Sequence, residues 1–111
     1  MAGEAATFSR HILQRTDQLH RILDTAASSD PNAAELRQAD RENRYQSQRT
    51  YIDILLANGP LRDGLTPEEA QTTYATLASP DTYAFLTGDR GWAPEQYEHW
   101  LTDSLTRLLL P

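Results

Sequence analysis

Apolar side chains recur every three or four residues along most of this chain, which is the spacing of an α-helix rather than of a β-strand. The pattern predicts helices over Glu4–Ser28 and Pro31–Ala57, a third that begins at Pro67, and a fourth that begins at Pro94 and runs to Leu110. In the first segment one apolar stripe consists of Phe8, Ile12, Leu19, Ile22, Leu23 and Ala26. We therefore expect a single all-α domain over residues 1–111.

Residues that cap helices lie at the predicted boundaries. Asp30 suits the start of the second helix, and Thr66 with Glu69 forms a capping box at the start of the third. Gly59 suits the left-handed position that follows a helix. At Ser79–Pro80 the third helix either kinks or gives way to a new turn that Ser79 caps.

The middle of the second helix is almost wholly polar, and this allows two interpretations. In one, Asn43, Gln46 and Thr50 share an inward face and hydrogen-bond a small ligand, while Tyr45 or Tyr51 stacks on it. In the other, the stretch is a solvated helix face. Leaving a buried polar group without a partner costs about 1–3 kcal/mol, which favours the solvated face.

The last helix presents an unusually wide apolar face, wider than one neighbouring helix covers. This face consists of Tyr97, Trp100, Leu101, Leu105, Leu108 and Leu109. Large apolar surfaces indicate a partner, and buried aromatic residues often anchor an interface. We therefore expect Trp100 at a dimer interface, with Trp92 in the corner that precedes the helix.

Composition excludes several classes of protein. All ten cationic residues are Arg, the chain has neither Val nor Cys, and the formal net charge is −6. Without Cys there is no disulfide framework and no thiolate metal site, and no apolar run approaches the length of a membrane span. The N-terminal sequence lacks the pattern of a secretory signal, so we expect a cytoplasmic protein without a membrane partner. An acidic chain is not expected to bind nucleic acid by itself.

Residues of catalytic or metal-binding type do not form a recognisable motif. The histidines His11, His20 and His99 are not three or four residues apart, so the sequence predicts no metal site on a helix. Glu68 and Glu69 are adjacent at a helix start, where negative charge is stabilising. Since no nucleophile, base and orienting group can be assembled, we expect no enzyme activity and no cofactor.

The second half of the chain resembles the C-terminal domain of the TetR family of bacterial transcription regulators. The resemblance is carried by the motif GLTPEEA, by the break at Ser79–Pro80 with Tyr83 and Leu86 after it, and by the run GWAPEQYEHWL with its closing RLLL. It is strongest over Leu61–Leu110 and looser before it.

Membership of this family implies an antiparallel helical bundle that binds a small effector and forms a homodimer. The last two helices would pack against their symmetry copies as a four-helix bundle. Under the resemblance the first and second helices line part of the effector pocket, which makes Asn43, Gln46, Thr50 and Tyr51 the candidate effector contacts. The interface residues would be Tyr74, Tyr83, Tyr97, Trp100, Leu101, Leu105 and Leu108.

The helix-turn-helix domain with which family members read DNA has no counterpart in this sequence. Under the resemblance, operator binding would therefore reside in a domain that this sequence lacks. An alternative is a free-standing helical dimerisation protein that modulates full-length regulators by forming heterodimers with them.

Overall fold

The computed structural model describes residues 2–111, and these residues form helices and connecting turns without a β-strand. The helices are α1 (Ala2–Ala27), α2 (Pro31–Asn58), α3 (Pro67–Leu77), α4 (Pro80–Ala84) and α5 (Pro94–Leu109), with a π-helical turn, η1 (Phe85–Asp89), between the last two. The prediction of an all-α fold is confirmed for the described part of the chain.

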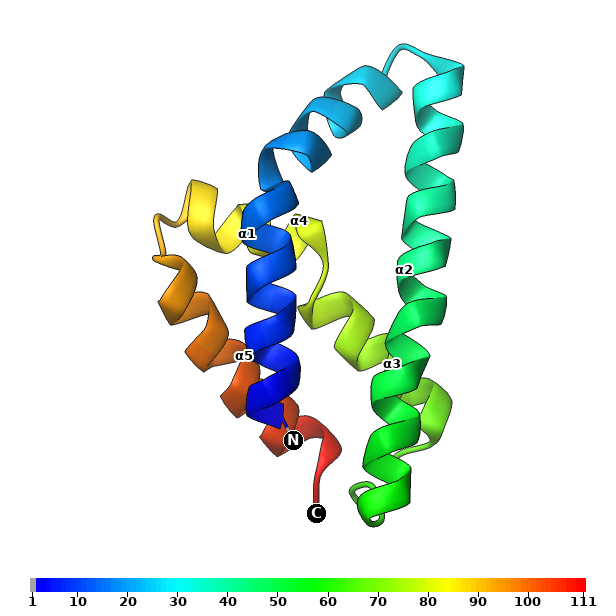
Figure 1. Ribbon diagram of the computed structural model, residues 1–111, viewed down its shortest axis with the longest axis vertical. Helices are drawn as coiled ribbons and strands as arrows, with labels where there is room; N and C mark the ends of the chain where they lie inside the picture. Colours follow the sequence, from blue (N-terminus) through cyan, green and yellow to red (C-terminus); the bar gives the residue numbers. More distant parts are fainter. Residues whose placement is uncertain (1) are drawn as a thin grey trace.

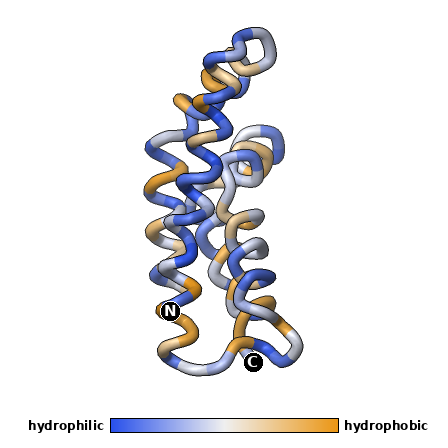
Figure 2. Tube along the Cα trace, turned by 90° about the vertical axis from the view of Figure 1, so that its right-hand side faces the viewer, coloured by the Kyte–Doolittle hydropathy of each residue, from blue (hydrophilic) through white to orange (hydrophobic). Residues whose placement is uncertain are grey.

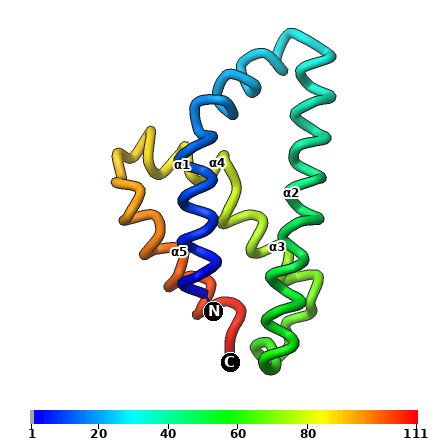
Figure 3. The backbone as a smooth tube through the Cα atoms, viewed as in Figure 1, coloured from blue at the N-terminus to red at the C-terminus, as the bar shows by residue number. Residues whose placement is uncertain are grey.

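Helices α1 and α2 run antiparallel and join at a short turn, so that they form a long hairpin (Figure 1). Helix α3 lies beside the half of α2 that is remote from this turn, and α5 lies beside the corresponding half of α1. The two described ends of the chain lie at the same end of the molecule, opposite the hairpin turn (Figure 3). Among the helices, α1 and α5 share the most extensive contact.

Side-chain hydrogen bonds begin the third and fourth helices as the sequence predicts. The Thr66 N–H donates to Oε1 of Glu69 at 3.0 Å, and the Glu69 N–H donates to Oγ1 of Thr66 at 3.1 Å. At the break that follows α3, the Thr82 N–H donates to Oγ of Ser79 at 3.1 Å. The chain therefore starts a new capped helix there rather than continuing through a kink.

The turns on either side of α2 differ in how well the sequence anticipates them. Asp30 caps the helix as expected, since its carboxylate accepts from the Asn32 N–H at 2.9 Å. Gly59 does not adopt the predicted left-handed helical conformation and instead has φ 154° and ψ −179°. This backbone conformation, like the predicted one, favours glycine, because glycine has no Cβ.

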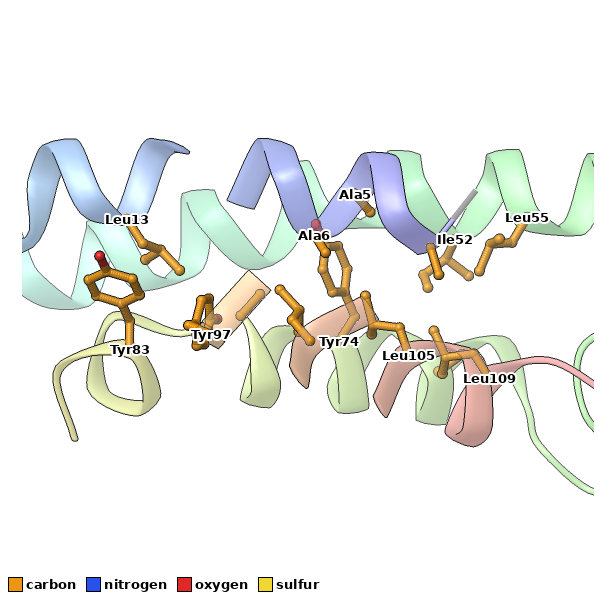
Figure 4. Packing of buried hydrophobic residues seen from close by; sticks show 14 of the residues in the cluster. Ala5, Ala6, Leu13, Ile52, Leu55, Tyr74, Tyr83, Tyr97, Leu105 and Leu109 are labelled. Carbon is orange, nitrogen blue, oxygen red and sulfur yellow. The ribbon is translucent and has the colours of Figure 1, made fainter. Parts of the chain in front are cut away.

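The core lies in the part of the molecule remote from the hairpin turn, which we call the base. Side chains from all five helices meet there (Figure 4). Helix α1 contributes mostly small residues, whereas α3, α4 and α5 contribute tyrosines and leucines. The Tyr83 and Tyr97 rings pack edge to face with their centres 5.0 Å apart, and the Tyr97 hydroxyl donates to the Leu77 carbonyl at 2.7 Å. That bond satisfies the one polar group of a fully buried ring.

Most of the predicted dimer-interface residues belong to this core. Five side chains, those of Tyr74, Tyr83, Tyr97, Leu101 and Leu105, are at most 4% exposed within the single chain. Their interface assignment is corrected, because a side chain already removed from water has no surface left to bury against a partner. Of the predicted set, only Trp100, partly buried, and Leu108, 39% exposed, keep accessible surface.

The outer half of the α1–α2 hairpin has no core of its own. From residue 14 to residue 51, all of which the structure describes, no residue is buried. This tip projects beyond the other helices and is largely hydrophilic (Figure 2). Ion pairs and partly buried contacts therefore connect α1 to α2 there, while apolar burial holds the base.

At the base, an ionic contact adds to the apolar packing of α1 on α5. Glu98 accepts hydrogen bonds from Nε of Arg10 and from Oγ1 of Thr7, each at 2.8 Å. These donors stabilise the ionised carboxylate, and the hydrogen bond from Arg10 has the largest effect. The pKa of Glu98 is therefore below its ordinary value.

The core assignment of α5 predicts unequal effects for a buried and an exposed leucine of the chain. Leu105→Ala removes a fully buried side chain and should cost about 2–5 kcal/mol of unfolding free energy. Leu36→Ala, at a helical position of α2 that is 62% exposed, serves as the matched control and should cost less than about 1 kcal/mol. Urea denaturation followed by circular dichroism measures both, and equal losses would contradict the assignment of Leu105 to the core of the single chain.

The contact of Glu98 predicts an acid-sensitive share of stability. Because its pKa is lower in the folded state, the stabilisation is present above the ordinary glutamate pKa and is lost as the pH falls through the folded-state value. At about pH 7, Glu98→Gln should lower the unfolding free energy by about 1 kcal/mol, and the deficit should shrink towards about pH 3.

The exposed Glu35, which lies beyond the first turn of α2, provides the control for this measurement. Glu35→Gln should change stability by less than about 0.5 kcal/mol at either pH. A deficit for Glu98→Gln that is the same at both pH values would contradict the role of the charged carboxylate.

Candidate functional site

An apolar cleft of about 690 Å³ opens between the first part of α1 and the second part of α2, and α3 closes its floor. Its volume lies within the range of small-molecule sites in proteins. The lining side chains come from α1 (Glu4, Ala5, Phe8, Ser9, Ile12, Leu13), from α2 (Arg44, Ser47, Gln48, Thr50, Tyr51, Ile54), and from α3 with the residue after it (Tyr74, Ala78). We call this cavity the apolar cleft.

The walls of the apolar cleft expose large apolar side chains to water. Phe8 of α1 is 64% exposed and Ile54 of α2 is 46% exposed. Each square ångström of such surface that a ligand covers contributes about 25 cal/mol to binding before the costs of association. The cleft is therefore suited to a molecule with a substantial apolar body.

Two tyrosines and a serine add polar groups to the floor of the cleft. The Tyr51 and Tyr74 rings are tilted against each other with centres 4.8 Å apart, and the Tyr74 hydroxyl lies within hydrogen-bonding distance of Oγ of Ser9, at 2.8 Å. Burial raises the pKa of Tyr51 to about 12, with smaller contributions from the neighbouring Tyr74 and Glu4. A tyrosine hydroxyl is protonated at neutral pH even at its ordinary pKa, so the Tyr51 hydroxyl can donate to a ligand.

The predicted effector residues divide between this cleft and the outer surface. Thr50 and Tyr51 line the cleft, as expected for ligand contacts. Gln46 does not, because it faces a shallow groove beside α3 and donates to Glu42 at 2.8 Å. Asn43 is exposed and also lies outside the cleft. The polar middle of α2 is thus largely a solvated face, with a cleft-lining strip along one side.

The sequence predicts that the first helix borders an effector pocket, but it selects no residue of that helix for ligand contact. Phe8 and Ile12, from the predicted apolar stripe, line the cleft, whereas the buried residues of α1 are Ala2, Ala5, Ala6, Ser9 and Leu13. The helix thus turns a face of small side chains towards the core and a face of larger apolar ones towards the cleft. Two adjacent apolar faces on one helix are visible in the sequence, and they indicate that α1 contacts more than the core.

A second, polar cavity of about 340 Å³ lies towards the hairpin tip, between α1, α2 and the junction of α3 with α4. Three arginine–aspartate pairs line it: Arg37–Asp24 at 2.8 Å, Arg41–Asp81 at 3.1 Å and Arg44–Asp40. We call this cavity the polar cavity. Each pair stabilises the hairpin tip modestly, because these side chains remain partly exposed.

His20 completes the lining of the polar cavity from α1. Its Nε2 lies 3.4 Å from Oδ2 of Asp40 and 3.4 Å from Nη1 of Arg44. Its Nδ1 is out of contact with solvent and has no hydrogen-bond partner, and the same holds for Nε of Arg37, whose N–H is not aligned with the nearby Asp24 oxygen. Buried polar atoms without partners are uncommon, so this cavity has hydrogen-bonding capacity that the protein itself leaves unused.

The two cavities adjoin. Arg44 and Gln48, one helical turn apart on α2, line both of them. The two cavities therefore lie side by side along α2, the apolar cleft towards the base of the molecule and the polar cavity towards the hairpin tip.

Metal-binding clusters and membrane-spanning helices are both absent from the described residues. No group of three or more His, Cys, Asp or Glu side chains is placed to hold a metal ion within residues 2–111. Across the same range, no helix combines the length and apolar character that crossing a membrane requires.

Comparison with known proteins identifies no relative of this chain. No protein-family model, curated protein or solved structure matches the chain. Functional inference therefore depends on the cleft and on the residues that line it.

Proposed function

We propose that this chain is the effector-binding domain of a TetR-type transcription regulator. The observation that carries the proposal is the apolar cleft between α1 and α2, with its large exposed apolar side chains and its polar floor. An all-helical domain with a ligand cleft between its helices agrees with what the sequence resemblance implies. DNA recognition in such a regulator resides in a separate helix-turn-helix domain.

Ligand binding in this cleft has a direct physical rationale. Phe8 and Ile54 face water in the free protein, and a bound molecule would shield them. The Tyr51 hydroxyl and the Ser9–Tyr74 pair would fix the orientation of the ligand, since a few polar groups in an apolar site supply specificity. Because α1 and α2 form opposite walls, a ligand would also set the distance between them.

Homodimerisation is the second part of the proposal, and it is supported more narrowly than the sequence predicts. Trp100, Ser104 and Leu108 follow one another at four-residue spacing on α5, and each keeps exposed surface. Trp100 is anchored from within the chain, since its ring packs against those of Trp92 and Tyr97 at 6.1 Å and 5.8 Å. A rigid aromatic residue beside an exposed leucine is typical of an interface.

Ligand binding is tested with the uncharged fluorophore N-phenyl-1-naphthylamine, whose emission rises in apolar sites. We expect saturable binding to the folded chain. Ser47→Phe places a large side chain at the exposed edge of the cleft and should weaken binding at least about tenfold, because it fills the site.

Gln46 provides the matched control, since it is the neighbouring exposed residue of the same helix and faces away from the cleft. Gln46→Phe should leave the affinity within about twofold of the original. Absence of saturable binding to the unmodified chain, or equal weakening by both substitutions, would overturn the proposed ligand site.

Dimerisation is tested separately by analytical ultracentrifugation. We expect a dimer, and Leu108→Asp should weaken it at least about tenfold, because a charge would be desolvated at the interface. Phe8→Asp introduces the same charge at an exposed position of the cleft wall and should leave the dimer intact. A monomeric unmodified chain would contradict the dimer while leaving the ligand site unaffected.

A further inference from the structure

We propose that the ligand of this site is an amphiphile that carries a carboxylate, with its apolar body in the apolar cleft and its carboxylate in the polar cavity. This inference rests on the proposed function, because it requires that the apolar cleft bind a small molecule. It goes further by naming the chemical class of that molecule and the residues that recognise its head: His20, Arg37 and Arg44.

Adjacency of the two cavities is the first observation behind the inference. Arg44 and Gln48 line both, so the end of the apolar cleft that lies towards the hairpin tip is bordered by a guanidinium and an amide. A molecule that fills the apolar cleft and extends towards the hairpin tip meets the Arg44 guanidinium first. The site thus matches a ligand whose polarity changes along its length.

An excess of hydrogen-bond donors in the polar cavity decides the chemistry of the head group. A guanidinium has five N–H groups, and each of the three arginines there pairs with a single aspartate. Nδ1 of His20 is buried without a hydrogen-bond partner, and Nε of Arg37 lies 2.8 Å from Oδ1 of Asp24 with its N–H poorly aligned for a hydrogen bond. A ligand that supplies acceptors would satisfy these groups, whereas a cationic head would meet guanidinium groups whose carboxylate partners are already engaged.

Charge balance favours a carboxylate over a more highly charged head. The three arginines of the polar cavity are matched by Asp24, Asp40 and Asp81, so the site has no large excess of positive charge to hold a doubly charged phosphate. A carboxylate has a single charge, and its planar shape pairs with a guanidinium through two parallel hydrogen bonds. Arg44, at the junction of the two cavities, is placed to make that contact.

The experiment compares two probes with the same tail, decanoate and decanol, by isothermal titration calorimetry with the folded chain. We expect decanoate to bind about tenfold more tightly than decanol, since a charge-assisted hydrogen bond is the main difference between them. The double variant Arg44→Gln/Asp40→Asn removes the junction guanidinium while preserving net charge. It should abolish the preference for decanoate, while decanol still binds because the apolar walls formed by Phe8 and Ile54 remain.

A matched control is available on α5, where Asp103 and Arg107 form an exposed pair with the same spacing and order. Asp103→Asn/Arg107→Gln should retain the preference for decanoate, which excludes a general effect of surface charge. Because decanol has no charged head group, an unfolded variant is recognised by its loss of both probes. Circular dichroism of each variant then confirms its helix content.

Four outcomes would overturn the inference. If decanoate and decanol bind equally, or if the preference persists in the Arg44→Gln/Asp40→Asn variant, the head-group site is wrong while the apolar ligand site stands. If neither probe binds but N-phenyl-1-naphthylamine does, the amphiphile is the wrong class. If none of the three binds, the proposed function fails as well.

Discussion

Close packing of α1 against α5 is the constraint on which the rest of the molecule depends. The inner face of α1 consists of small side chains, among them Ala2, Ala5 and Ala6, and α5 turns its fully buried Tyr97 and Leu101 inward. Small residues allow helix axes to approach, so that larger side chains of the partner helix fill the space between them. With this base fixed, α1 holds one wall of the cleft in place, and the Glu98 carboxylate joins the same two helices at the edge of the core.

The sequence predicts where the helices of this protein begin and end better than it predicts which helices pack against one another. Capping at Thr66 and Ser79 follows from local hydrogen bonds, which depend on residues only three positions apart. The buried face of α1 could not be chosen in this way, because Phe8 and Leu13 are both apolar and only the position of α5 decides between their faces. The same reason explains Leu105, which the sequence assigns to a partner although α5 is covered within its own chain.

The candidate site shows a similar division between local and distant information. Thr50 and Tyr51 could be selected from the amphipathic pattern of one helix, and both line the cleft. The grouping of His20 with Arg44 could not, because these residues are 24 positions apart and meet only through the hairpin turn. Polar clusters that join two helices in this manner require the crossing geometry as well as the sequence.

The absence of buried residues between positions 14 and 51 has a consequence for how the molecule fluctuates. Segments with few apolar contacts open at much lower free energy than the global unfolding transition. The hairpin tip can therefore separate and close again while the base remains folded, and the polar cavity opens with it. A molecule that bridged His20 and Arg44 would hold the tip closed. Ligand binding would then make the hairpin more rigid.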